Sequence, residues 1–79
     1  MSLENNVHLA RLYDLYGPLL SKAQQKVMED YLLKDITISE IAENDGVSRQ
    51  AVKDAVSKAE KKLKMYEDKL GFLNRLNKE

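Results

Sequence analysis

One stretch of fifteen residues decides the fold, and it reads Ile38-Ser39-Glu40-Ile41-Ala42-Glu43-Asn44-Asp45-Gly46-Val47-Ser48-Arg49-Gln50-Ala51-Val52. Two helices separated by a short turn that contains glycine are typical of a helix-turn-helix. Ala42 is small enough to let two helices cross closely, and Gly46 supplies the backbone freedom that a sharp turn needs. We expect Ser39 and Ser48 to cap the two helices. The competing interpretation is an ordinary pair of helices joined by a glycine turn.

The second helix of such a motif presents its first turns to the major groove of DNA. We expect Val47 and Val52 to point into the core. The outward side chains are then the candidate nucleic-acid-binding residues: Ser48, Arg49, Gln50, Lys53, Asp54, Ser57 and Lys58. Arg49 can bind guanine edges or phosphate, and Gln50 can form two hydrogen bonds with adenine.

Apolar residues at helical spacing also precede the motif. A first helix should stop near Gly17–Pro18, because proline disfavours a helical residue before it. Ser21 and Gln24 have the spacing of a capping box, so a second helix is predicted over 22–34, followed by a turn at 35–37. The chain has no strand-like alternation, and its fold class is therefore predicted as all-α.

Downstream of the motif, apolar residues continue at spacings of four and three, which is a heptad pattern: Val52, Val56, Ala59, Leu63, Tyr66, Leu70 and Leu73. We expect one long helix here. The domain organisation is then a single domain over 1–79, with the motif at about 38–58 and a C-terminal helix extension at about 59–76.

The end of this apolar seam raises the question of what covers it. Its first half should pack on the second and third helices, whereas 66–73 has no obvious cover except the N-terminal helix. That helix has two apolar faces, one with Val7, Ala10 and Tyr13 and the other with Leu9, Leu12 and Tyr16. We therefore predict a twofold homodimer in which one face serves a neighbour. The alternative is a monomer whose first helix closes the seam.

Charge is balanced over the whole chain but not along it. Thirteen basic and thirteen acidic side chains give a net charge of zero, which argues against strong non-specific binding to nucleic acid. Residues 1–47 nevertheless carry −4 and residues 48–79 carry +4, with most of the excess within 49–64. A solvated helix face is the simplest explanation of such a run. On a recognition helix it also favours a nucleic-acid partner.

The sequence contains few residues suited to metal binding or catalysis. The chain has no cysteine and a single histidine, His8, so a zinc site of the usual kind and any metal or other cofactor are not expected. The acidic pairs Glu29–Asp30 and Glu67–Asp68 are helix neighbours that do not face each other. We therefore predict no enzyme, no catalytic residue and no small-molecule ligand. The chain has no apolar run of 18 residues and no secretory signal, so we expect a cytoplasmic protein without a membrane partner.

The sequence also resembles the YlxM family of small bacterial helix-turn-helix proteins, which are built like region 4 of sigma factors. The matching segments are Ser39-Glu40-Ile41-Ala42-Glu43, Gly46-Val47-Ser48-Arg49-Gln50-Ala51-Val52, Tyr66-Glu67 and Lys69-Leu70. The resemblance covers about residues 7–71. It implies a helix-turn-helix bundle, a winged-helix-like DNA-binding fold without the wing, with an extended C-terminal helix. It also implies a link to the signal recognition particle pathway.

Two functions are predicted from these observations. The first is a helix-turn-helix nucleic-acid-binding protein of regulatory type, acting in transcription regulation on DNA rather than RNA, and modulating the signal recognition particle pathway. The alternative is a protein-interaction module that docks a component of that particle without reading nucleic acid directly.

Overall fold

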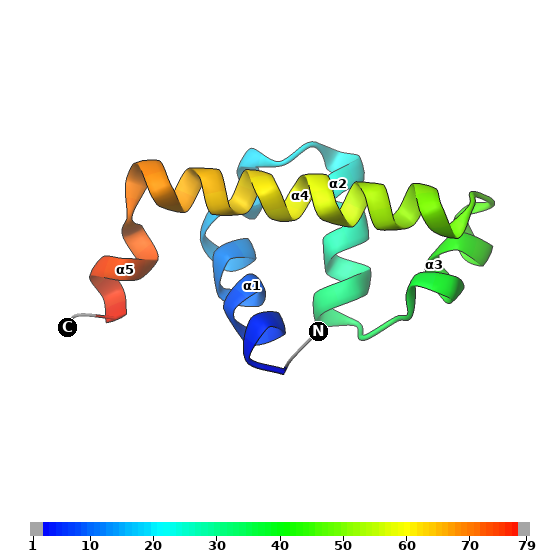
Figure 1. Cartoon of the computed structure of the whole chain (residues 1–79), viewed down its shortest axis with the longest axis horizontal. Helices are drawn as coiled ribbons and strands as arrows, with labels where there is room; N and C mark the ends of the chain where they lie inside the picture. Colours follow the sequence, from blue (N-terminus) through cyan, green and yellow to red (C-terminus); the bar gives the residue numbers. More distant parts are fainter. Residues whose placement is uncertain (1–2, 78–79) are drawn as a thin grey trace.

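The longest helix, α4 (Arg49–Leu70), runs along the whole molecule, and the other helices pack below it or at its ends (Figure 1). The computed structural model describes residues 3–77, with side chains from residue 6. With 22 residues, α4 is about 33 Å long at 1.5 Å per residue. It therefore sets the long dimension of a molecule that measures 42 × 24 × 16 Å.

The remaining elements are also helical. In chain order they are α1 (Leu3–Tyr16), the 3₁₀ turn η1 (Gly17–Leu19), α2 (Lys22–Met28), the π-helical turn η2 (Glu29–Leu33), α3 (Ile38–Asp45) and, after α4, α5 (Phe72–Asn77). Residues 3–77 contain no strand, so the predicted all-α class is confirmed.

Local signals place the first helices where the sequence predicts them. α1 ends immediately before Gly17–Pro18. The backbone N–H of Gln24 donates to Ser21 Oγ and the backbone N–H of Ser21 donates to Gln24 Oε1, both at 3.2 Å, so the predicted capping box is confirmed. The helix predicted over 22–34 is α2 continued by η2, and it ends where Asp35 adopts a positive φ of 56°.

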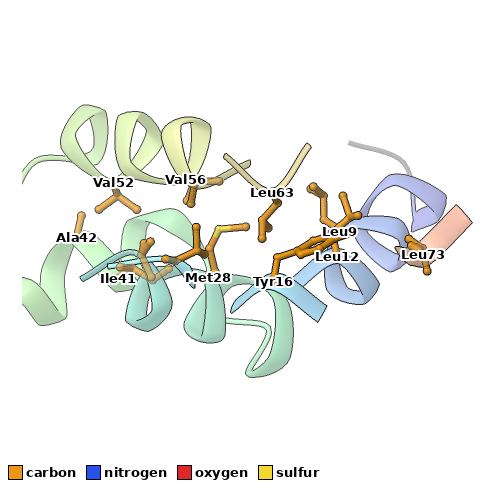
Figure 2. Close-up of a cluster of buried hydrophobic side chains, with 13 residues drawn as sticks. Leu9, Leu12, Tyr16, Met28, Ile41, Ala42, Val52, Val56, Leu63 and Leu73 are labelled. Atoms are coloured by element: carbon orange, nitrogen blue, oxygen red, sulfur yellow. The ribbon is translucent and has the colours of Figure 1, made fainter. Parts of the chain in front are cut away.

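The core lies between α4 and the helices beneath it. Val52, Val56 and Leu63 point from α4 toward buried side chains of α1, α2 and α3 (Figure 2). The buried apolar residues are Leu9, Leu12, Tyr16, Leu20, Val27, Met28, Ile41, Ala42, Val52, Val56, Ala59, Leu63 and Leu73. The inward side of α4 is thus committed to the core, and its opposite side faces solvent.

The C-terminal extension is not the single helix predicted over 59–76. α4 ends at Leu70, and Gly71 takes a left-handed φ of 65° and donates its N–H to the Glu67 carbonyl oxygen at 2.8 Å. Glycine adopts this conformation without steric cost, so the chain turns sharply into α5. Leu73 is buried, but it reaches the core from α5 after this turn.

Two side chains hold α5 in place, and we call them the Tyr16–Glu67 latch. The Tyr16 hydroxyl donates to Glu67 and accepts the Phe72 N–H at 3.2 Å. The Glu67 carboxylate also accepts the N–H groups of Leu73, at 3.1 Å, and Asn74, at 3.0 Å. These are the free N–H groups at the start of α5, so a carboxylate from α4 caps the following helix.

The latch agrees with the alternative in which the first helix covers 66–73 within the chain. Leu9, Leu12 and Tyr16 of α1 are fully buried. The centroid of the Tyr16 ring lies 6.0 Å from the centroid of the Tyr66 ring and 6.2 Å from that of the Phe72 ring. The first helix therefore closes most of the strip within one chain.

Glu67 should make stability depend on pH. The hydrogen bond from Tyr16 is the main cause that lowers the pKa of Glu67 below its ordinary 4.5, and the α5 N–H groups act in the same direction. A carboxyl group whose pKa is lower in the folded state stabilises the fold above its unfolded pKa, and this contribution is lost as pH falls through the folded value. Thermal melting followed by circular dichroism between pH 7 and pH 3 should therefore show a smaller fall in Tm for Glu67→Gln than for wild type.

The neighbouring Asp68 supplies the control, because it is exposed and also lies on α4. Asp68→Asn should keep the wild-type pH dependence. An equal fall in Tm for Glu67→Gln and wild type would show that the latch carboxylate does not stabilise α5.

Candidate nucleic-acid interface

The turn between α3 and α4 is held by two backbone hydrogen bonds. Gly46 has φ 67° and ψ 33°, the left-handed conformation predicted for it. The Val47 N–H donates to the Ala42 carbonyl oxygen at 3.0 Å, and the Gly46 N–H donates to that of Glu43 at 3.4 Å. This pair of bonds is a Schellman motif, which ends α3 and redirects the chain toward α4.

The start of α4 is the predicted one. Ser48 is extended, with φ −75° and ψ 157°, and its hydroxyl accepts the Ala51 N–H at 3.0 Å. This hydrogen bond satisfies one of the free N–H groups of the first turn. The first turn of α4 contains no acidic side chain, so the positive end of the helix dipole is left uncompensated there.

The predicted cap of α3 is wrong by two residues. Thr37 rather than Ser39 is the cap: its hydroxyl accepts the Glu40 N–H at 3.1 Å and donates to Glu40 Oε1 at 3.0 Å. Ser39 lies inside the first turn of α3. The spacing of threonine and glutamate three residues apart is the signal that identifies this cap.

All seven candidate residues lie on the exposed side of α4 or at its N-terminus. Arg49, Gln50 and Lys53 project from the first two turns, and Val52 and Val56 are buried on the opposite side of the helix, as predicted. The structure therefore presents one continuous polar surface, which we call the α4 face: Ser48, Arg49, Gln50, Lys53, Asp54, Ser57 and Lys58.

Val47 is the exception among the predicted core residues. Its side chain is 48% exposed, whereas the sequence predicted that it points inward. Val47 lies between the left-handed Gly46 and the extended Ser48, so the turn carries its side chain outward. An apolar side chain consequently borders the α4 face.

An ion pair ties α2 to the end of α3 beside the turn. Lys26 Nζ lies 3.0 Å from Asp45 Oδ1 and 3.4 Å from Asp30 Oδ2. The hydrogen bonds with Asp45 and Asp30 raise the pKa of Lys26 above its ordinary value, so this lysine stays charged. Its charge offsets that of the Asp45 carboxylate next to the turn.

One contact on the α4 face was not predicted from the sequence. The Gln50 Nε2 group donates to Asp54 Oδ1 at 3.0 Å. Residues four apart are neighbours on a helix surface, and this spacing is the signal that could have indicated the pair. Further along α4, Lys64 Nζ lies 3.6 Å from Glu60 Oε2, and Lys62 Nζ donates to Gln24 Oε1 at 3.3 Å. Part of the predicted basic run therefore makes contacts within the chain.

Among the described side chains, from residue 6 to residue 77, no three His, Cys, Asp or Glu residues are placed to hold a metal ion. None of the helices within the described residues has the length and apolar character needed to cross a membrane.

The sequence of the chain is similar to those of known bacterial proteins. Residues 3–79 match the model of the UPF0122 family, described as helix-turn-helix proteins like YlxM and p13. The chain is 48% identical over 65 residues to a UPF0122 protein of Symbiobacterium thermophilum, 43% over 72 residues to one of Fusobacterium nucleatum, and 45% over 64 residues to one of Caldanaerobacter subterraneus.

These matches cover 82%, 91% and 81% of this chain, but 61%, 70% and 55% of the respective relatives. The chain thus spans little more than half to about two thirds of the length of these relatives. The common part contains the helix-turn-helix motif, and the family description agrees with the fold.

Replacement of Gly46 should test the turn. A Cβ atom at Gly46 would have no heavy atom within 4 Å, so Gly46→Ala introduces no clash and changes only the backbone preference. Alanine in the left-handed region costs about 1–2 kcal/mol of unfolding free energy. Urea unfolding should show this loss, and Gly46→Asn should lose less because asparagine tolerates the left-handed conformation. Equal stability of wild type and Gly46→Ala would contradict the turn geometry.

Proposed function

The chain belongs to the UPF0122 family of YlxM-like and p13-like helix-turn-helix proteins, and from this premise we propose that it is a nucleic-acid-binding regulatory protein. The family description supports a helix-turn-helix regulator rather than an enzyme. The α4 face is the surface that would contact the nucleic acid.

The observation that carries the proposal is the position of Arg49 and Lys53 on the free N-terminal turns of an anchored helix. Both side chains are exposed, while Val52 and Val56 on the opposite side are buried. The core thus holds the helix rigidly and leaves its cations toward solvent. Arginine forms paired hydrogen bonds with guanine or phosphate, and lysine contributes a point charge for phosphate.

We propose duplex DNA rather than duplex RNA as the partner. The major groove of B-form DNA is about 12 Å wide and admits an α-helix, whereas that of A-form RNA is too deep and narrow for side chains to read. The exposed N-terminus of α4 suits the major groove of B-form DNA, because the positive end of the helix dipole can also approach a phosphate. Such a regulator would control transcription and would work in the cytoplasm.

A homodimer remains part of this proposal, because helix-turn-helix dimers bind two half-sites about 34 Å apart. Exposed apolar side chains at the end of α4 and on α5 lie next to the latch and supply a candidate contact surface: Leu70, Phe72 and Leu76. Sedimentation equilibrium of wild type and Leu70→Asp tests this part. A wild type that stays monomeric at high micromolar concentration would leave a regulator that binds DNA as a monomer.

We also propose that the chain modulates the signal recognition particle pathway, a role that the resemblance of its sequence to the YlxM family implies. A second candidate is docking to a protein component of that particle. The exposed Val47 beside the turn favours it, because an apolar side chain at the border of a polar surface suits a protein partner. The zero net charge of the chain agrees with this candidate as well.

Two substitutions on the α4 face should separate base reading from phosphate binding. Arg49→Ala should weaken binding to a selected DNA site by about 1–3 kcal/mol if the guanidinium binds a base edge. Lys53→Ala should weaken binding to every duplex by a similar factor. It should also reduce the slope of log K against log salt by about one. Fluorescence anisotropy with labelled duplexes at several salt concentrations measures both quantities.

Lys69→Ala is the matched control, because Lys69 is also exposed on α4 but lies in its last turn, away from the motif. It should bind like wild type. If wild type binds the proteins of the particle with little salt dependence and does not bind duplexes, the docking function replaces the DNA-binding one.

A further inference from the structure

The Gln50–Asp54 hydrogen bond gives the α4 face a feature that exposed charge alone does not supply. Both side chains are exposed, and the bond joins Gln50 Nε2 to Asp54 Oδ1 at 3.0 Å. Within residues 3–77, no cation lies within ion-pair distance of the Asp54 carboxylate. The aspartate is therefore available to act on its glutamine neighbour.

The chemistry of the two groups makes this contact directional. An ionised carboxylate only accepts hydrogen bonds, whereas the two ends of a glutamine amide differ, one donating and the other accepting. Asp54 can therefore hold the NH₂ end of Gln50 and repels the carbonyl end. The amide is held in one of its two orientations before any partner arrives.

The amide held in this way keeps one free N–H and its carbonyl oxygen. These are the two groups with which glutamine binds adenine in the major groove: the oxygen accepts from N6 and the N–H donates to N7. We propose that Asp54 is a positioning residue that orients Gln50 to read an adenine. This inference rests on the proposed DNA-binding function and adds a specificity to it.

A second consequence follows from the charge of Asp54. A carboxylate on a surface that approaches DNA repels the phosphates, so it lowers affinity for every sequence. Removal of Asp54 should then weaken base preference while it leaves affinity unchanged or raises it. An aspartate that merely stabilised α4 would not separate these two quantities.

The experiment begins with selection of binding sites from a random duplex library by the wild-type chain. Anisotropy competition then compares duplexes that carry each of the four base pairs at every position of the selected site. The variants are Gln50→Ala, Asp54→Ala, Asp54→Glu and Asp68→Ala. Asp68→Ala is the matched control, because it removes an exposed carboxylate from α4 nearly three turns beyond the candidate residues.

Wild type should prefer adenine at one position by about tenfold or more, the range expected of a paired amide contact. Gln50→Ala should abolish this preference. Asp54→Ala should reduce it to within about threefold without loss of affinity for random duplex. Asp54→Glu should retain most of the preference, since glutamate keeps the accepting carboxylate, and Asp68→Ala should retain all of it. Circular dichroism confirms that each variant is folded.

The results that overturn the inference differ from those that overturn the function. If wild type selects no duplex, the DNA-binding proposal fails and the adenine contact fails with it. If wild type selects a site and Asp54→Ala keeps the full adenine preference, Gln50 reads the base without Asp54, and the positioning role is wrong. If Gln50→Ala keeps the preference, another side chain reads that base, and the inference is wrong in both parts.

Discussion

Burial of one side of α4 is the constraint on which the rest of the structure depends. Val52, Val56, Ala59 and Leu63 follow each other at spacings of four and three, and all four are buried. The absence of a large side chain at Ala59 lets the neighbouring helices approach closely. Because this side of the helix is held along about three turns, the opposite side is presented in a defined orientation, which is the condition for reading a groove rather than only attracting a polyanion.

The two ends of α4 have different tasks. The N-terminal end carries the α4 face, whereas the C-terminal end carries Glu67. The Glu67 carboxylate caps α5 and accepts a hydrogen bond from the Tyr16 hydroxyl. Burial raises the pKa of the Tyr16 hydroxyl, so it remains a donor at neutral pH. The latch joins α1 to α5 and compensates for the shortness of α5, since a helix of six residues is not stable alone.

Charge separation explains how a chain with no net charge can suit an acidic partner. The acidic excess lies in 1–47, where part of it is engaged in structure: Asp30 lies between Lys26 and Lys34, and Lys26 also holds Asp45. The basic excess of 48–79 is carried largely by α4. Electrostatic attraction acts over about 8–10 Å at ordinary salt, so the local balance governs contact with a surface more than the sum does.

The sequence by itself determined the helical class, the capping box at Ser21, the turn at Gly46 and the start of α4 after Ser48. These depend on hydrogen bonds or backbone preferences within a few residues, so local pattern is sufficient. It also placed the candidate residues on the exposed side of α4, because helical periodicity settles which positions face away from the core. Only the tertiary structure decided where the C-terminal segment packs. The latch joins Tyr16 to Glu67 across 51 positions, and no local pattern encodes such a contact. The course of the chain after Gly71 was decided in the same way, since a glycine permits a sharp turn but the packing of α5 against α1 selects it.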